Sequence, residues 1–258
     1  MAGLKRFFAN GLAVGEEAEL SGEEFEHAKN VLRISVGEEV VLLDNSGKEF
    51  TAIVTSVEKK RLLLNVVRAD EGGREATNDV FLAFGYLKNA DKNEFIVQKA
   101  VELGVKKIVV FSSAFSSAYM NGNKLERLNK VAREAAKQCL RSFAPEVVYF
   151  PTLTEALSAV QIAEHKLFAC EFAVESETDI RNLTGSTAIV IGSEGGFSKE
   201  ESEEAKALGF SLITLGKRIL RAETAAVTLT SVVMFSLGEL GAYCKTPCEQ
   251  MDPIGGAL

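Results

Sequence analysis

This 258-residue chain has no tryptophan and few residues of the types that bind metals or cross-link, with 2 histidines and 4 cysteines. No run approaches the roughly 20 uncharged apolar residues of a membrane-spanning helix, and the start, MAGLKRFFANGL, is too polar for a signal peptide. These absences predict a cytoplasmic protein. Because the cysteines (Cys139, Cys170, Cys244 and Cys248) form no CxxC pair and lack histidine partners, we expect reduced thiols and no metal site.

What the chain does contain is typical of a globular protein. Hydrophobic residues make up 47% and charged residues 25%, which excludes disordered, collagen-like and coiled-coil classes. The length favours a small domain followed by a medium one.

The net charge of −7 argues against a nucleic-acid partner when the chain is taken as a whole. The charge is unevenly distributed, however. Residues 74–141 carry 12 Lys and Arg against 7 Asp and Glu, whereas residues 142–258 carry 8 against 16. An RNA-binding role is therefore compatible with the first of these segments, although solvated helix faces explain such an excess equally well.

Residues 1–70 alternate short β-type runs with turns and predict a small barrel-like β domain. Its three clearest strands lie within residues 36–67, the first two joined at Asp44–Gly47. One helix is expected over residues 22–32, with Ser21 as N-cap and Glu24 completing a capping box. The polar, glycine-rich residues 71–78 are the expected linker.

Residues 79–242 alternate buried strands with amphipathic helices, a pattern that predicts a parallel sheet covered on both faces. Strands are expected within residues 79–87, 106–113, 165–170, 186–193 and 210–216, and helices within residues 93–104, 124–140, 198–209 and 222–241. Residues 243–258 are expected to form a frayed tail.

Two loops of this α/β part draw attention. The first, "IGSEGGFS" (191–198), follows an apolar strand, and its three glycines let the backbone approach a ligand closely. It matches neither a dinucleotide nor a triphosphate motif, and a tight turn without a ligand explains it too. The acids after Ser198 suit the first turns of a helix.

The second loop, "LGKRILRAETA" (215–225), joins the last strand to an apolar helix one βα unit later. Because loops at the carboxyl ends of parallel strands meet at one sheet edge, we expect the two loops to share one pocket. Arg221 and Glu223 are candidate functional residues there, with a local ion pair as the alternative.

Together the two strings resemble the patterns IGPEGGFS-x-x-E and LG-x-RILRxETA of the uridine-N3 methyltransferases of bacterial small-subunit ribosomal RNA, the RsmE family. These enzymes belong to the SPOUT class. Further matches run from Arg6 to Leu240, including "VQKAVELGV" at residues 97–105. Two positions depart from the family: Ser193 replaces its proline, and Ala114-Phe115-Ser116 replaces a Glu-Arg-Ser run.

The resemblance implies a PUA-like RNA-binding β domain at residues 1–70 and a SPOUT methyltransferase domain at residues 79–242, with a deep trefoil knot. It implies S-adenosylmethionine as cofactor. The cofactor pocket would be lined by Cys170, Glu171, Gly192, Glu194, Gly195, Gly196, Leu215, Gly216, Ile219 and Leu220.

The implied reaction is attack of uracil N3 on a sulfonium methyl group. Because uridine loses its N3 proton only near roughly pH 9 to 10, the site must take that proton or stabilise the anion. Arg221 is our candidate for stabilising the charge on a carbonyl oxygen. Glu223 or Glu194 would act as the base or would orient Arg221.

The implied partners are 16S ribosomal RNA, in the assembled small subunit, and a second copy of the chain. Phosphate contacts are expected from Arg6, Lys29, Arg33, Lys88, Lys92, Gln138 and Arg141. Three alternatives remain open at this point: a SPOUT enzyme acting on another base or on ribose, a non-catalytic RNA-binding protein, and a generic nucleotide-binding α/β protein.

Overall fold

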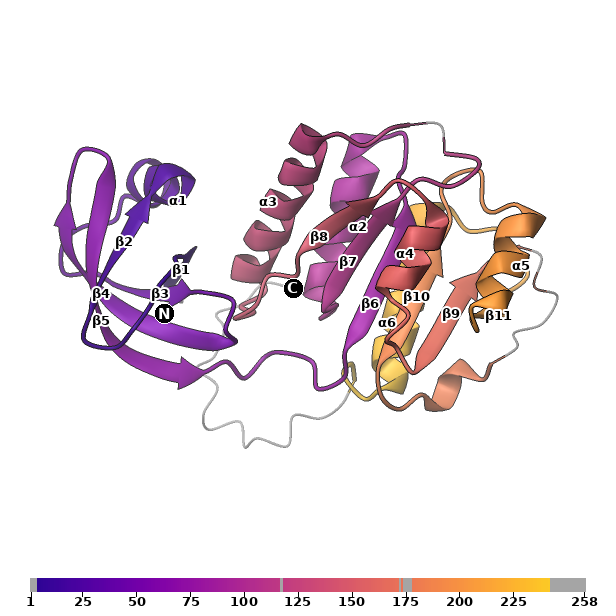
Figure 1. Ribbon diagram of the computed structural model, residues 1–258. Coiled ribbons are helices and arrows are strands. Elements are labelled where there is room, and N and C mark those ends of the chain that lie inside the picture. Colours follow the sequence, from indigo (N-terminus) through magenta and orange to yellow (C-terminus); the bar gives the residue numbers. More distant parts are fainter. Residues whose placement is uncertain (1–3, 117, 172, 174–177, 242–258) are drawn as a thin grey trace. The chain divides into compact units, whose positions relative to one another are not determined.

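The computed structural model describes residues 4–116, 118–171, 173 and 178–241 (Figure 1). The chain divides into two compact units. Of the described residues, the first unit contains those up to Glu75 together with Ala136–Phe143, and the second contains Ala76–Ala135 and those from Ala144 to residue 241. The bounds set from the sequence at residues 70 and 78 stay a prediction, and the expected tail at 243–258 lies outside the described residues.

The first unit is built on a five-stranded mixed sheet with the strand order β1-β3-β4-β5-β2. β1 pairs with β3 in parallel, and the other neighbours are antiparallel. Its strands are β1 (Lys5–Phe8), β2 (Glu17–Ser21), β3 (Glu39–Leu43), β4 (Lys48–Val57) and β5 (Arg61–Glu71). The three predicted strands and the turn between the first two of them are confirmed.

The helix of the first unit differs from the prediction. α1 (Gly22–Glu26) is one short turn that continues as the π-helical segment η1 (His27–Val31). The Ser21 side chain makes no cap hydrogen bond, so the predicted capping box is wrong. Glu24 instead accepts a hydrogen bond from the buried Lys137 Nζ at 3.1 Å, and this tertiary partner takes the carboxylate that the box would have used.

The second unit is a six-stranded sheet in the order β11-β9-β10-β6-β7-β8, parallel throughout, which confirms the predicted α/β class (Figure 1). Its elements are β6 (Val80–Gly85), α2 (Ala90–Glu102), β7 (Lys107–Phe111), α3 (Gly122–Gln138), β8 (Val147–Phe150), α4 (Leu153–Ala159), β9 (His165–Ala169), η2 (Ile180–Asn182), β10 (Thr187–Ile191), α5 (Lys199–Ala207), β11 (Ser211–Ile213) and α6 (Ala222–Ser236). β8 and α4 were not predicted.

Helices cover both faces of this sheet (Figure 1). On one face, Ala188 and Val190 of β10 join a core with residues of α4 and α5, whereas α6 packs against β10 and β6 on the other. All five residues of β10 are therefore buried, and this explains the unbroken apolar run in its sequence.

Parallel strands end at a common edge, so the loops that follow β9, β10 and β11 come together. This edge holds the site described below. The trefoil knot implied by the resemblance stays a prediction. Within the described ranges, no helix has the length and apolar character needed to cross a bilayer.

Candidate functional site

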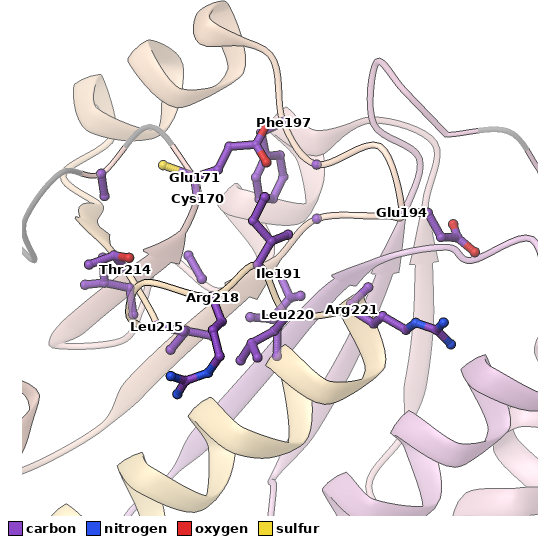
Figure 2. Close-up of a pocket in the computed structure, with 18 of the residues that line it drawn as sticks. Cys170, Glu171, Ile191, Glu194, Phe197, Thr214, Leu215, Arg218, Leu220 and Arg221 are labelled. Carbon is purple, nitrogen blue, oxygen red and sulfur yellow. The ribbon is translucent and has the colours of Figure 1, made fainter.

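A pocket of about 730 Å³ opens at the carboxyl ends of β9, β10 and β11 (Figure 2). Its walls are the loops after these three strands, the first turn of α6 and one residue of α2. The structure thus brings the two motif loops into one pocket, as predicted. The predicted pocket residues found in its wall are Cys170, Glu171, Gly192, Glu194, Gly196, Leu215, Gly216, Ile219 and Leu220.

The glycine loop turns tightly on itself. Gly196 N–H donates to the Ser193 carbonyl at 3.0 Å, and Gly196 has φ +67°, a conformation that favours glycine. A methyl group added at Gly192 would lie 3.1 Å from the Gly196 backbone. Gly195 is not part of the pocket wall, and a methyl group added there would lie 2.5 Å from Phe115 Cβ.

Helix α5 fixes the far end of this loop. Ser198 caps it by accepting a hydrogen bond from Glu201 N–H at 3.1 Å, while the Glu201 carboxylate accepts from Ser198 N–H at 2.8 Å. The predicted helix start is therefore confirmed, here as a complete capping box. Glu201 also accepts a hydrogen bond from the backbone N–H of Ala114 at 2.8 Å, which joins the loop after β7 to the same helix end.

The inner part of the pocket is apolar. It is lined by Ile191, Phe197, Ile213, Leu215 and Leu220, and the centroid of the buried Phe197 ring lies 4.1 Å from the centroid of the Phe168 ring. In the view of Figure 2, Arg221 and Glu194 lie at one end of the pocket, and Cys170, Glu171 and Thr214 lie at the other. The pocket thus combines an apolar interior with polar groups at both ends.

The charged end is organised by the start of α6. Arg221 occupies the N-cap position, its side chain makes no cap bond, and it is exposed. Glu223 Oε1 forms an ion pair with Lys92 Nζ of α2 at 2.9 Å, while Glu223 Oε2 is buried without a hydrogen-bond partner. The partner of Glu223 is thus Lys92, which lines the pocket, and the RNA contact expected of Lys92 stays a prediction.

Burial alone would raise the pKa of Glu223, but the hydrogen bond from Lys92, a backbone hydrogen bond and the charge of Arg221 outweigh it and hold the pKa below its ordinary 4.5. Glu223 is therefore a carboxylate at neutral pH. Its ion pair stabilises the fold above pH 4.5, and this contribution is lost as the pH falls through the lowered pKa.

Glu194 is exposed and accepts a hydrogen bond from Lys88 N–H at 3.0 Å. This bond links the loop after β6 to the glycine loop and fixes the direction of the carboxylate.

The residues predicted to contact RNA separate into two groups. Lys29, Arg33, Lys88 and Gln138 are exposed. The side chains of Arg6 and Arg141 are only 8% and 4% exposed, and they pair with Glu49 and Glu75 at 2.8 and 2.7 Å. Their burial does not agree with the predicted phosphate contacts, because both guanidinium groups stabilise the first unit from within.

The pocket residues that were not predicted include Thr214, Lys217 and Arg218. The latter two lie inside the recognised second motif, which is the signal that could have included them. Across the described ranges, no group of three or more His, Cys, Asp or Glu side chains could hold a metal ion.

Comparison with known proteins identifies the family. A model described as an RNA methyltransferase domain matches residues 74–234, and one described as an RNA methyltransferase PUA domain matches residues 20–67. A ribosomal RNA small subunit methyltransferase E from Rickettsia conorii is 30% identical over 93% of this chain and 97% of its own length. The chain belongs to this methyltransferase family.

Other members agree along the chain. The enzyme of the same name from Mesomycoplasma hyopneumoniae is 37% identical over 64% of this methyltransferase chain and 73% of its own. The Neisseria gonorrhoeae enzyme of that name, solved with S-adenosyl methionine, superposes with a TM-score of 0.81 at 30% identity, covering 91% of this chain and 98% of that one. The family and the PUA-like domain inferred from the sequence are thereby confirmed.

Proposed function

We propose that this protein transfers the methyl group of S-adenosylmethionine to N3 of a uridine in 16S ribosomal RNA. The observation that carries the proposal is the convergence of both motif loops on one pocket with an apolar interior and a charged end containing Arg221. A solved relative is described as bound to this cofactor, and the Rickettsia relative is named for methylation of small-subunit ribosomal RNA.

The pocket suits the cofactor. Its volume of about 730 Å³ lies within the usual range for ligands of this size, and its apolar walls fit an adenine ring. Leu215, Ile219 and Leu220 would pack against the adenosyl part, with backbone groups of Gly192, Gly196 and Gly216 close by; Cys170 and Glu171 would close the opposite end. Gly195 would act indirectly, by holding the loop. When bound, S-adenosylmethionine supplies an electrophilic methyl group on a sulfonium.

Arg221 is the central catalytic residue of the proposal. Uracil N3 becomes nucleophilic as its proton leaves, and the negative charge then spreads onto the neighbouring carbonyl oxygens. A guanidinium offers a planar set of donors and stays charged at every relevant pH, so Arg221 would stabilise this charge. Because Arg221 is exposed at the end of the pocket, it is accessible to a nucleobase of the RNA.

The carboxylates receive different roles. Because the pKa of Glu223 is lowered, it is a weak base, and we assign it to holding Lys92 in the pocket. Lys92 then adds a second positive charge beside Arg221. We assign Glu194 as the base that accepts the proton from uracil N3, because its carboxylate is exposed at the same end of the pocket and is held by Lys88 N–H.

RNA contacts are proposed for the exposed residues Lys29, Arg33, Lys88 and Gln138, without Arg6 and Arg141. The finer proposals are that the substrate is the assembled small subunit and that the enzyme is a homodimer. The exposed Val232 and Phe235 on α6 offer apolar surface that a second copy would cover.

The test is incubation of the protein with methyl-labelled S-adenosylmethionine and unmodified small subunits, in parallel with free 16S RNA. Mass spectrometry of the digested nucleosides should show 3-methyluridine. Another methylated nucleoside would overturn the choice of N3 and favour a different base or ribose. Absence of both product and cofactor binding by calorimetry would overturn the enzymatic assignment.

Glu223→Gln should lower the single-turnover rate by about tenfold, since Lys92 loses a charged hydrogen-bond partner. We expect the pH dependence of the rate between about pH 6 and 9.5 to keep its shape, because a carboxylate with a lowered pKa does not titrate there. Stopped time courses across this range measure both quantities.

Glu203→Gln on the exposed part of α5 is the matched control, and it should change neither the single-turnover rate nor its pH dependence. If Glu223→Gln removed an ionisation that the wild-type profile shows, Glu223 would be the base after all.

A further inference from the structure

Phe115 is an exposed aromatic side chain beside the glycine loop. It follows β7 in the loop that lies against the glycine loop, and 54% of it is exposed. Its place beside the ligand pocket makes this exposed ring a candidate contact residue for the substrate.

The loop that carries Phe115 is well fixed by its neighbours. Ala114 N–H donates to Glu201 Oε1 at 2.8 Å, and Ser116 N–H donates to the Ser113 carbonyl at 3.0 Å. Ser113 N–H in turn donates to Ser116 Oγ at 2.8 Å. The backbone on either side of Phe115 is therefore held by these hydrogen bonds.

Phe115 packs against Gly195, which lies next to the pocket. A methyl group at Gly195 would lie 2.5 Å from Phe115 Cβ, whereas both neighbours of Gly195, Glu194 and Gly196, line the pocket. Lys88 approaches the same stretch from the loop after β6, through its N–H bond to Glu194. An exposed aromatic ring and an exposed lysine thus flank the loop beside the charged end of the site.

We propose that Phe115 stacks on an unpaired base of the RNA strand that enters the site, with Lys88 meeting a neighbouring phosphate. A base must leave its helix to reach a reactive centre in a pocket, and the bases beside it then need a surface to replace lost stacking. Aromatic rings next to basic side chains provide it. This inference rests on the proposed function, since it supposes an RNA substrate at this pocket.

The absence of tryptophan makes a direct test possible. Phe115→Trp introduces a single reporter whose fluorescence should fall when 16S RNA or small subunits are added and stay unchanged with S-adenosylmethionine alone. Ile162→Trp, at an apolar position that is 82% exposed in the loop before β9, is the matched control and should not respond to RNA.

Kinetics provide the second measurement. Phe115→Leu keeps an apolar side chain on Gly195 but removes the ring, and it should raise the RNA concentration for half-maximal rate by about 5- to 100-fold with little change in the cofactor Kd. Phe115→Tyr should restore wild-type behaviour.

The two inferences fail separately. Wild-type methylation with no response of Phe115→Trp and no effect of Phe115→Leu would overturn the stacking proposal and leave the proposed function intact. Quenching by RNA with neither a methylated product nor cofactor binding would support stacking while overturning the enzymatic assignment. Emission from Phe115→Trp that changes with protein concentration and not with RNA would place a second protein copy on the ring, and stacking would be wrong.

Discussion

Arg221→Ala should lower the single-turnover rate of methyl transfer by about 10²- to 10³-fold at saturating cofactor and RNA. This is the size of effect seen when one donor to a developing negative charge is removed. The guanidinium is exposed at the charged end of the pocket, and its side chain is not needed to cap α6. The fold and the cofactor Kd should therefore be little changed, which calorimetry and thermal melting would show.

Two comparisons sharpen this prediction. Arg221→Lys keeps the charge but loses the planar donor fork, so it should recover only part of the rate. Arg181→Ala removes an arginine that is 84% exposed on η2 and should leave the rate unchanged. A rate in Arg221→Ala equal to wild type at saturation, with weaker cofactor binding, would make Arg221 a binding residue and not a stabiliser of charge.

The sequence predicted those parts of the fold that depend on neighbouring residues. An unbroken apolar run such as that of β10 has few alternatives to a buried strand, and the Ser198–Glu201 box marks the start of α5 because both partners lie in one turn. The same pattern misled at Ser21. There, Glu24 pairs with Lys137, which is 113 residues away and cannot be anticipated from the local sequence.

Charged side chains were the least predictable part of the site. Arginine and lysine in a basic stretch suggest RNA contacts, but Arg141 pairs with Glu75 across 66 positions and Lys92 with Glu223 across more than a hundred. Such pairs depend on how the chain returns upon itself. The motif loops were easier to place, because the topology of a parallel sheet brings loops at strand ends together whatever their side chains are.

The pocket also depends on the packing behind Ser193, one of the residues that line it. Ser193 is 5% exposed, and its hydroxyl lies 3.4 Å from that of Ser113. Gly85, at the end of β6, lies close against the backbone of Ser193. The backbone of the glycine loop is thus held between β6 and the loop after β7, and its position is a property of the surrounding packing.

Gly85→Ala should consequently weaken cofactor binding from outside the pocket. A methyl group at Gly85 would lie 2.6 Å from the backbone N of Ser193, and backbone cannot move aside as a flexible side chain can. Overpacking of this kind costs about 1–3 kcal/mol. If the loop absorbs the shift, the cofactor Kd should rise by about 5- to 150-fold, which calorimetry with S-adenosylmethionine measures.

Two glycines separate this effect from general instability. Gly73→Ala meets no atom within 4 Å and should behave as wild type. Gly72→Ala would bring a methyl group against the Ser142 side chain and the Gly47 carbonyl oxygen in the first unit, so it should lower the melting temperature without changing the cofactor Kd. The prediction would be wrong if Gly85→Ala behaved like Gly72→Ala, with a lowered melting temperature and the cofactor Kd of the wild type. The strain at the end of β6 would then not reach the pocket.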